Sequence, residues 1–95
     1  MSDSGPHQIL FYDYVSDVLA RRDPHREAHL TLLRAERDAG RVVMAGAVGD
    51  PVSGAMFVFR GADPEPAEAF ARRDPYMEAG LVTAWRIEPW NVVVV

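Results

Sequence analysis

The chain contains no cysteine and no lysine. Its 95 residues include ten basic side chains, and all ten are arginine. Without cysteine the protein forms no disulfide, no thiolate nucleophile and no cysteine-bound zinc or iron–sulfur cluster. Without lysine it has no side-chain amine for Schiff-base chemistry. These two absences exclude several classes of enzyme before any motif is considered.

The sequence also lacks an excess of positive charge and any long apolar run. The formal net charge is −4, so no basic stripe is available to neutralise phosphates and we expect no nucleic-acid partner. No apolar run approaches the roughly 20 residues that a membrane helix needs. Residues 1–7 lack the basic region and apolar core of a signal peptide. We therefore expect no membrane association and a cytoplasmic location.

The length is that of one domain, 1–95, in which the polar residues 1–7 form a flexible lead-in. Residues 8–15, rich in aromatic and β-branched side chains, predict a strand. Asp23-Pro24 predicts the start of a helix, with Asp23 capping it, that continues to about Ala39. Further along, the pattern predicts strands at 42–48 and 54–60, a helix at 65–73, a short turn after Asp74, and a last strand at 81–95 interrupted near Pro89.

This order, β-α-β-β-α-β, predicts an α+β ferredoxin-like sandwich: a four-stranded antiparallel sheet with two helices on one face. In the first helix, helical spacing predicts a buried stripe at Ala28, Leu32, Ala35 and Ala39, with Leu33 beside it. The uncovered sheet face is predicted to carry several large apolar residues: Tyr12, Met44, Phe57, Trp85 and Val93. Such a face packs most simply on a second copy, so we expect a homodimer.

Two residues stand out as candidates for acid–base chemistry, His29 and Asp74. His29 lies at the border of the predicted stripe, one turn after Arg26, and histidine titrates near working pH. His29 can equally be a buried histidine bonded to a backbone carbonyl. Asp74 can equally be a simple helix cap, as Asp23 and Asp63 are before their own prolines. The spacing alone leaves these alternatives open.

Other sites are disfavoured by the pattern. His25 and His29 are spaced to share a divalent metal, but the sequence between them, Arg26-Glu27-Ala28, does not complete an H-E-x-x-H motif. The glycines follow no phosphate-loop or dinucleotide spacing, and no serine lies in a nucleophile elbow. We therefore expect neither a metal nor a cofactor.

Several segments together resemble the YCII (YciI-like) family. They are Arg26-Glu27-Ala28-His29-Leu30, Gly40-Arg41-Val42-Val43-Met44-Ala45-Gly46, Asp74-Pro75-Tyr76-Met77-Glu78-Ala79-Gly80-Leu81-Val82 and Pro89-Trp90. The resemblance extends from about Ile9 to Val92. It implies a ferredoxin-like fold of the dimeric α/β-barrel superfamily. It also implies a His–Asp active-site pair, which falls on His29 and Asp74.

The leading hypothesis is a cofactor-independent enzyme of lyase or isomerase type that acts on a small organic molecule. His29 acts as general base or acid, Asp74 orients its imidazole, and Arg26 holds an anionic group of the substrate. We expect His29 and Asp74 to line one pocket with Arg26 at its rim. The alternative is a non-catalytic dimer that binds a small molecule or serves as an accessory domain. The sequence names no substrate.

Overall fold

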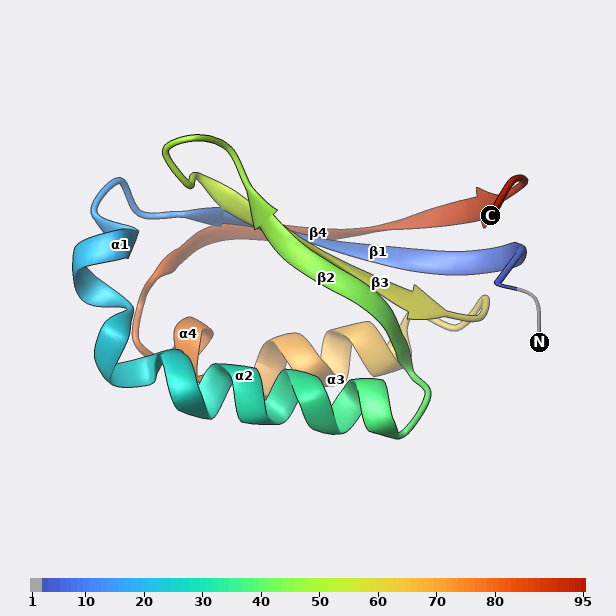
Figure 1. Cartoon of the computed structure of the whole chain (residues 1–95), viewed down its shortest axis with the longest axis horizontal. Helices are drawn as coiled ribbons and strands as arrows, with labels where there is room; N and C mark the ends of the chain where they lie inside the picture. Colours follow the sequence, from blue (N-terminus) through green and yellow to red (C-terminus); the bar gives the residue numbers. More distant parts are fainter. Residues whose placement is uncertain (1–2) are drawn as a thin grey trace.

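The computed structural model describes residues 3–95 as one sheet with a layer of helices on a single face (Figure 1). The strands are β1 (Gly5–Tyr14), β2 (Val42–Val48), β3 (Gly54–Arg60) and β4 (Val82–Val92). The helices are α1 (Val18–Arg21), α2 (Asp23–Asp38), α3 (Glu65–Arg73) and α4 (Pro75–Glu78). None of the helices formed by the described residues is long and apolar enough to span a membrane.

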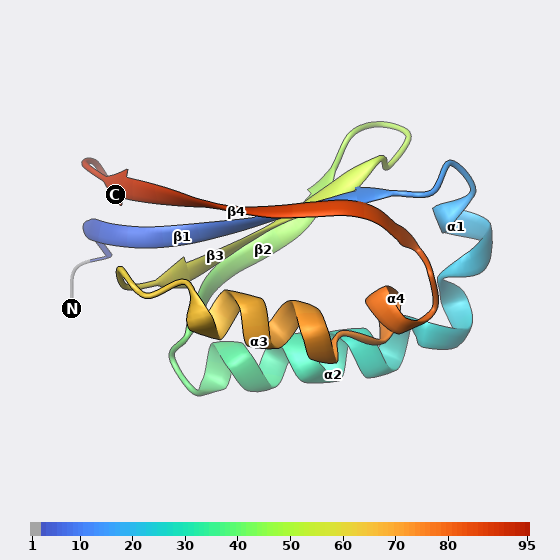
Figure 2. The same ribbon diagram turned by 180° about the vertical axis from the view of Figure 1, so that it is seen from behind.

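The strands follow the spatial order β2-β3-β1-β4, and every neighbouring pair is antiparallel. Helices α2 and α3 lie along the same face of the sheet, as the view from behind also shows (Figure 2). This arrangement is the predicted ferredoxin-like sandwich. The predicted bounds of β2, β3 and α3 are confirmed to the residue.

Both ends of the chain differ from the prediction. Gly5–His7 belong to β1 and pair with β4, so the expected flexible lead-in is wrong for these residues. Met1 and Ser2 lie outside the described residues. The last strand is not interrupted at Pro89, which pairs with Gln8, and it continues to Val92. Since β4 is an edge strand, proline is tolerated where its nitrogen faces the open edge.

The first turn and the buried face of α2 differ from the prediction. Asp23 is the first helical residue and makes no capping bond, because the helix begins after Arg22. The three alanines of the predicted stripe, Ala28, Ala35 and Ala39, are exposed. The inward face instead carries two buried polar residues, His29 and Glu36, with Leu32 and Leu33 half-buried between them. The predicted helical spacing of the buried residues is correct, but the buried face is shifted by one residue along the helix.

Glu36 is buried because two arginines accompany it. Arg41 donates to both of its carboxylate oxygens, and Arg73 approaches Glu36 Oε1 at 3.8 Å from the end of α3. A buried charge is tolerated when it is paired and hydrogen-bonded. This cluster ties α2 to α3 and to the start of β2.

The core between the sheet and the helices is aromatic. Leu10, Tyr12, Phe57, Phe59 and Phe70 are buried there together. Tyr12 and Phe57 therefore face the helices, and their predicted place on the uncovered face is wrong. Side chains alternate between the faces of a strand, so an error of one residue in phase reverses the face.

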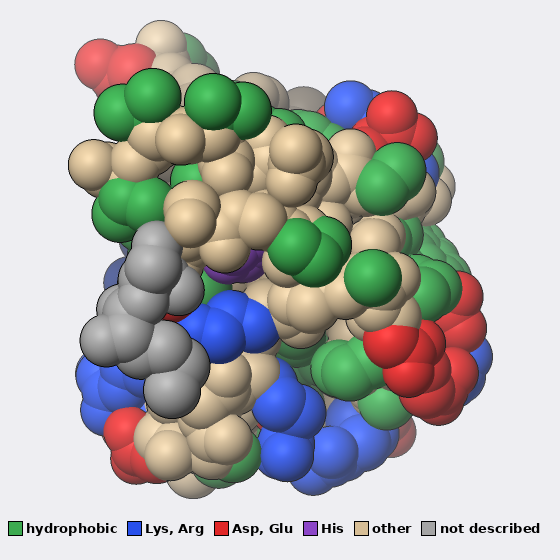
Figure 3. All heavy atoms as spheres, turned by 90° about the vertical axis from the view of Figure 1, so that its right-hand side faces the viewer, with side chains coloured by type: hydrophobic (Ala, Val, Ile, Leu, Met, Phe, Trp, Pro, Cys, Tyr) green, Lys and Arg blue, Asp and Glu red, His purple; other side chains and the backbone are tan. Residues whose placement is uncertain are grey.

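No helix formed by residues 3–95 covers the other face of the sheet. Met44 pairs with Val58 there, and Met44 is 64% exposed. Arg86 lies 4.1 Å from the ring centre of Phe11, and Trp90 pairs with His7. Figure 3 shows several hydrophobic side chains along this upper side, and most of the arginine surface in view lies lower, toward the helix layer.

Gly54 provides a test of how closely β3 and β1 approach. A Cβ on Gly54 lies 2.3 Å from the backbone oxygen of Tyr12, whereas a Cβ on Gly46 meets nothing within 4 Å. We expect Gly54→Ala to lower the free energy of unfolding by roughly 1–3 kcal/mol, the usual cost of overpacking. Gly46→Ala, in the same sheet, is the control and should change it by less than about 0.5 kcal/mol. Chemical denaturation measures both, and equal effects would contradict the close approach.

Candidate active site

Asp74 lies in the one-residue junction between α3 and α4. Its backbone is extended (φ −68°, ψ 123°), as a residue before proline prefers, and this conformation ends α3 and begins α4. Helix α4 ends at Glu78, Gly80 follows with a φ of +74°, and the Leu81 N–H donates to the Tyr76 carbonyl at 3.1 Å. The short helix therefore holds Asp74 and Tyr76 in fixed positions.

The Asp74 carboxylate is 1% exposed and fully hydrogen-bonded. Its Oδ1 accepts from the Tyr76 backbone N–H at 3.0 Å and from His29 Nδ1 at 2.7 Å. Its Oδ2 accepts from the Tyr12 hydroxyl at 2.8 Å. Asp74 therefore caps α4 and also binds His29, so the capping interpretation is confirmed and the capping carboxylate is at the same time the partner of His29.

His29 projects from α2 toward the sheet and is 5% exposed. Its imidazole stacks on the Tyr76 ring with the ring centres 3.9 Å apart and the planes 3° from parallel. Phe57 and Phe70 meet the imidazole edge-on at 6.1 and 6.3 Å. Because a carboxylate only accepts hydrogen bonds, Nδ1 carries the proton, and in the neutral ring Nε2 holds the lone pair.

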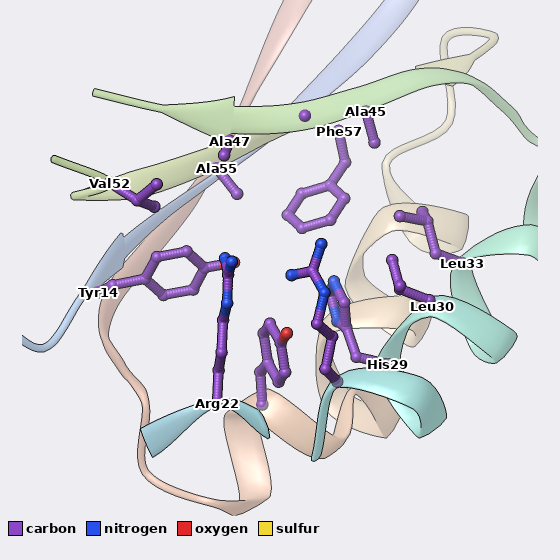
Figure 4. A pocket seen from close by; sticks show the side chains of 13 residues that line it. Tyr14, Arg22, His29, Leu30, Leu33, Ala45, Ala47, Val52, Ala55 and Phe57 are labelled. Atoms are coloured by element: carbon purple, nitrogen blue, oxygen red, sulfur yellow. The ribbon is translucent and has the colours of Figure 1, made fainter. Parts of the chain in front are cut away.

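His29 lines a cavity of about 320 Å³ between α2 and the open end of the sheet (Figure 4). The wall on the sheet side is apolar, and most of its side chains are small. Its lining residues are Ala45, Gly46, Ala47, Val52, Ala55 and Phe57. The helix side contributes Leu30 and Leu33. A cavity of this size and lining is suited to a small organic molecule.

The polar groups of the cavity wall are two arginines, two tyrosines and His29. Arg22 and Arg26 both line the cavity, and neither forms an ion pair with any residue in the range 3–95. Tyr14 and Tyr76 line it as well, with ring centres 6.1 Å apart. The cavity therefore combines apolar walls with positive charge.

Two tyrosines near Asp74 are held in the neutral form. Burial raises the pKa of Tyr12 well above its usual value, and the Asp74 charge and hydrogen bond raise it further. Burial also raises the pKa of Tyr14, and Asp74 adds to this, while Arg22 and Arg26 act in the opposite direction. Both phenols therefore remain hydrogen-bond donors at neutral pH.

The structure brings the sequence candidates together, with one difference. His29 and Arg26 line the cavity, but Asp74 lies behind His29 and is not part of the wall. His25 lies against α4 outside this cavity. Among residues 3–95 no three His, Asp or Glu side chains form a group that could hold a metal ion.

Sequence reasoning missed Tyr12, Tyr14, Tyr76 and Arg22. Arg22 was detectable, because it precedes Arg26 by four residues and His29 by seven, which is the spacing of one helix face. Tyr76 was detectable as the second residue after the capping Asp74. No local pattern indicated the role of the tyrosines of β1, because the sequence alone does not say which face of the sheet each residue of the strand points to.

The comparison with known families agrees with the motifs quoted above. The sequence profile of the YCII-related domain matches residues 8–91. This chain belongs to the YCII-related family. No curated protein matches the sequence of this YCII-related protein.

Solved structures similar to this YCII-related protein include 5-chloro-2-hydroxyhydroquinone dehydrochlorinase (TftG) from Burkholderia phenoliruptrix AC1100, in complex with 2,5-dihydroxybenzoquinone. Its TM-score is 0.74 at 19% identity, with 90% of this chain and 93% of that chain covered. A dimeric ferredoxin-like protein from an uncultured marine organism has a TM-score of 0.57 at 12% identity, with coverages of 97% and 90%. At these identities the likeness shows the ferredoxin-like fold.

Tyr12 provides a test of the buried network. Tyr12→Phe removes one donor to Asp74, so we expect the free energy of unfolding at neutral pH to fall by about 1–3 kcal/mol. In the wild type, stability should also decline as the pH rises above about 10, the usual tyrosine value, because the unfolded chain then releases a proton that the folded chain retains. Tyr12→Phe should make this decline shallower. Denaturation across alkaline pH measures both slopes, and identical slopes would argue against the buried phenol.

Proposed function

We propose that this YCII-related protein is an enzyme that uses the His29–Asp74 pair for acid–base chemistry on a small organic molecule, in a reaction of lyase or isomerase type. The observation that carries the proposal is that the two nitrogens of the His29 imidazole have different surroundings. Nδ1 is bound to a buried carboxylate at 2.7 Å and His29 lines the cavity, so we assign the reactive role to Nε2.

The surroundings of His29 support a general base. Asp74 selects the tautomer with the lone pair on Nε2, and its negative charge stabilises the imidazolium that forms when a proton is taken. The stacking with Tyr76 holds the ring plane in place. A base held in this way needs no rearrangement during proton transfer, which is the condition for efficient catalysis.

The cavity also supports a particular kind of substrate. Arg26 lies on the same helix face as His29 and has no ion-pair partner in the described chain, so it is available to an anionic group of the substrate. The apolar walls fit a small ring or chain. No residue role in this proposal depends on a metal or cofactor.

The reaction named for TftG is consistent with this chemistry. A dehydrochlorination removes a proton from the substrate while chloride leaves with the bonding electron pair of the carbon–chlorine bond. A histidine base is suited to removing the proton. The cavity of this protein is suited to a small hydroxylated ring, and TftG binds a ring of this kind, 2,5-dihydroxybenzoquinone. The reaction of this protein is proposed at the level of proton transfer, with elimination of a leaving group as one form of it.

The alternative, a non-catalytic binding domain, is favoured by one observation. Asp74 has a structural role, since it caps α4 and accepts a hydrogen bond from Tyr12 on β1. On this view His29 completes a structural network and the cavity only captures a ligand.

Replacement of His29 separates the two functions. The assay follows solvent deuterium incorporation by NMR into a panel of small hydroxylated rings and keto acids, and chloride release from 5-chloro-2-hydroxyhydroquinone. We expect the wild type to accelerate at least one reaction and His29→Gln to lower that rate by about 10²–10⁴-fold, the range for loss of a general base. His25→Gln, one turn away and outside the cavity, is the control and should retain the rate. A wild type that binds members of the panel without turnover would establish the binding function.

We also propose that the protein forms a homodimer through the uncovered face of the sheet. This face carries Met44, Met56, Val58 and Phe11 without a covering helix, and Trp90 stands 44% exposed beside them. The final residues Val93–Val95 are also exposed. A contiguous apolar patch of this kind on a sheet is typical of an interface, and a second copy is the partner with the matching surface.

The dimer can be tested by introducing a charge. Met44→Glu places a carboxylate in the middle of the proposed interface, so we expect the sedimenting mass at micromolar concentration to fall from twice 10.6 kDa toward the chain mass. Leu19→Glu makes the same change at an exposed leucine of α1 and should leave the dimer intact. A wild type that sediments as a monomer would refute the interface.

A further inference from the structure

The hydroxyl of Tyr76 is an unexplained polar group in the cavity wall. Tyr76 is 2% exposed, and its hydroxyl is the one buried side-chain polar atom in residues 3–95 without a hydrogen-bond partner. Burying a hydroxyl without a partner is destabilising, and such groups in native structures usually have a functional reason. The ring is held in place by its stacking on His29, so the hydroxyl has little freedom to seek another partner.

The neighbouring Tyr12 shows what a structural tyrosine does in this fold. Its hydroxyl is equally buried, and it donates to Asp74 Oδ2 at 2.8 Å. Tyr76 lies closer in sequence to the same carboxylate, but only its backbone N–H binds Asp74. The Tyr76 hydroxyl is therefore unused by the network that holds the site together.

Two further polar groups belong to the same part of the wall. Tyr14 packs edge-on against Tyr76, and Arg22 has no ion-pair partner among the described residues. Figure 4 shows Tyr14 and Arg22 entering the cavity from the side opposite His29. Tyr14 is a neutral phenol, since burial and Asp74 both raise its pKa.

We propose that Tyr76, Tyr14 and Arg22 form an oxyanion subsite that binds an ionised oxygen of the substrate while His29 acts on another part of the same molecule. This proposal rests on the proposed function and deepens it. Each of the three side chains can donate a hydrogen bond, and Arg22 has no acceptor capacity at all. The matching ligand group is therefore an acceptor with negative charge, such as a phenolate, an enolate or a carboxylate.

The two sides of the cavity then have opposite requirements. At His29 the neutral Nε2 accepts a proton, whereas the subsite stabilises negative charge. A substrate that fits both is a small organic acid with an ionised oxygen at one end and an acidic proton at the other. When His29 removes that proton, the electron pair left on the substrate delocalises toward the oxygen, and the subsite stabilises the added charge.

The closing experiment measures binding and uses 2,5-dihydroxybenzoquinone, an acidic hydroxylated ring, as the probe. Calorimetry compares the wild type with Tyr76→Phe and Arg22→Gln, and Arg21→Gln is the matched control, since Arg21 pairs with Asp17 and lies outside the cavity. We expect the two subsite variants to weaken binding by about 10-fold or more, the usual loss for a hydrogen bond to a charged group, and Arg21→Gln to leave it unchanged. The dimethyl ether of the probe carries no charge, so we expect it to bind neither the wild type nor any of the variants.

A measurement without ligand supports the same test. Because the Tyr76 hydroxyl has no partner, Tyr76→Phe should leave the melting temperature unchanged or raise it, whereas Tyr12→Phe should lower it. A lower melting temperature for Tyr76→Phe would assign its hydroxyl a structural bond and overturn the subsite. Failure of the wild type to bind the anionic probe, or equal binding of the probe and its ether, would also overturn it.

The outcomes distinguish this proposal from the proposed function. If Tyr76→Phe and Arg22→Gln bind as tightly as the wild type while His29→Gln loses proton exchange, the subsite is wrong and the acid–base role holds. If the subsite variants bind weakly while His29→Gln exchanges protons at the wild-type rate, the subsite holds and the acid–base role fails.

Discussion

The buried Asp74 carboxylate is the interaction on which the rest of the structure depends. Its three donors come from three elements: the Tyr12 hydroxyl from β1, His29 Nδ1 from α2 and the Tyr76 N–H from α4. One charge therefore joins the sheet to both parts of the helix layer. A carboxylate at 1% exposure is stable only because each oxygen is satisfied, so the positions of these elements are mutually constrained.

The same constraint fixes the imidazole of His29. Asp74 binds Nδ1 of this ring, which leaves the other nitrogen out of that bond, and His29 lines the cavity. The Tyr76 ring that α4 positions is the surface on which the imidazole stacks. The contacts that hold α4 in place are thus the same contacts that orient His29. A role as a helix cap therefore does not prevent Asp74 from binding His29.

Much of the fold was predictable because its signals are local. Turn residues, proline and glycine located β2, β3 and α3 to the residue, and the order of elements then implied the ferredoxin-like topology. The errors share one cause. Which side of a helix or strand turns toward the core is set by contacts with residues that are distant in the sequence. The alanines of α2 have the right period, but buried His29 and Glu36 with their partners decide which face turns inward. Pro89 remains within β4 because that strand is at the edge of the sheet.

By itself the sequence determined the composition limits, the element order, the family motifs and the two candidate residues, His29 and Asp74, that the structure joins by a hydrogen bond. Local spacing and side-chain chemistry are sufficient for these conclusions. Only the tertiary structure decided that Tyr12 faces Asp74, that Asp74 lies behind His29, and that Tyr14, Tyr76 and Arg22 share one cavity. Those residues come from separate elements, and their meeting depends on strand phase and helix docking, which result from the burial of the whole core rather than from any local pattern.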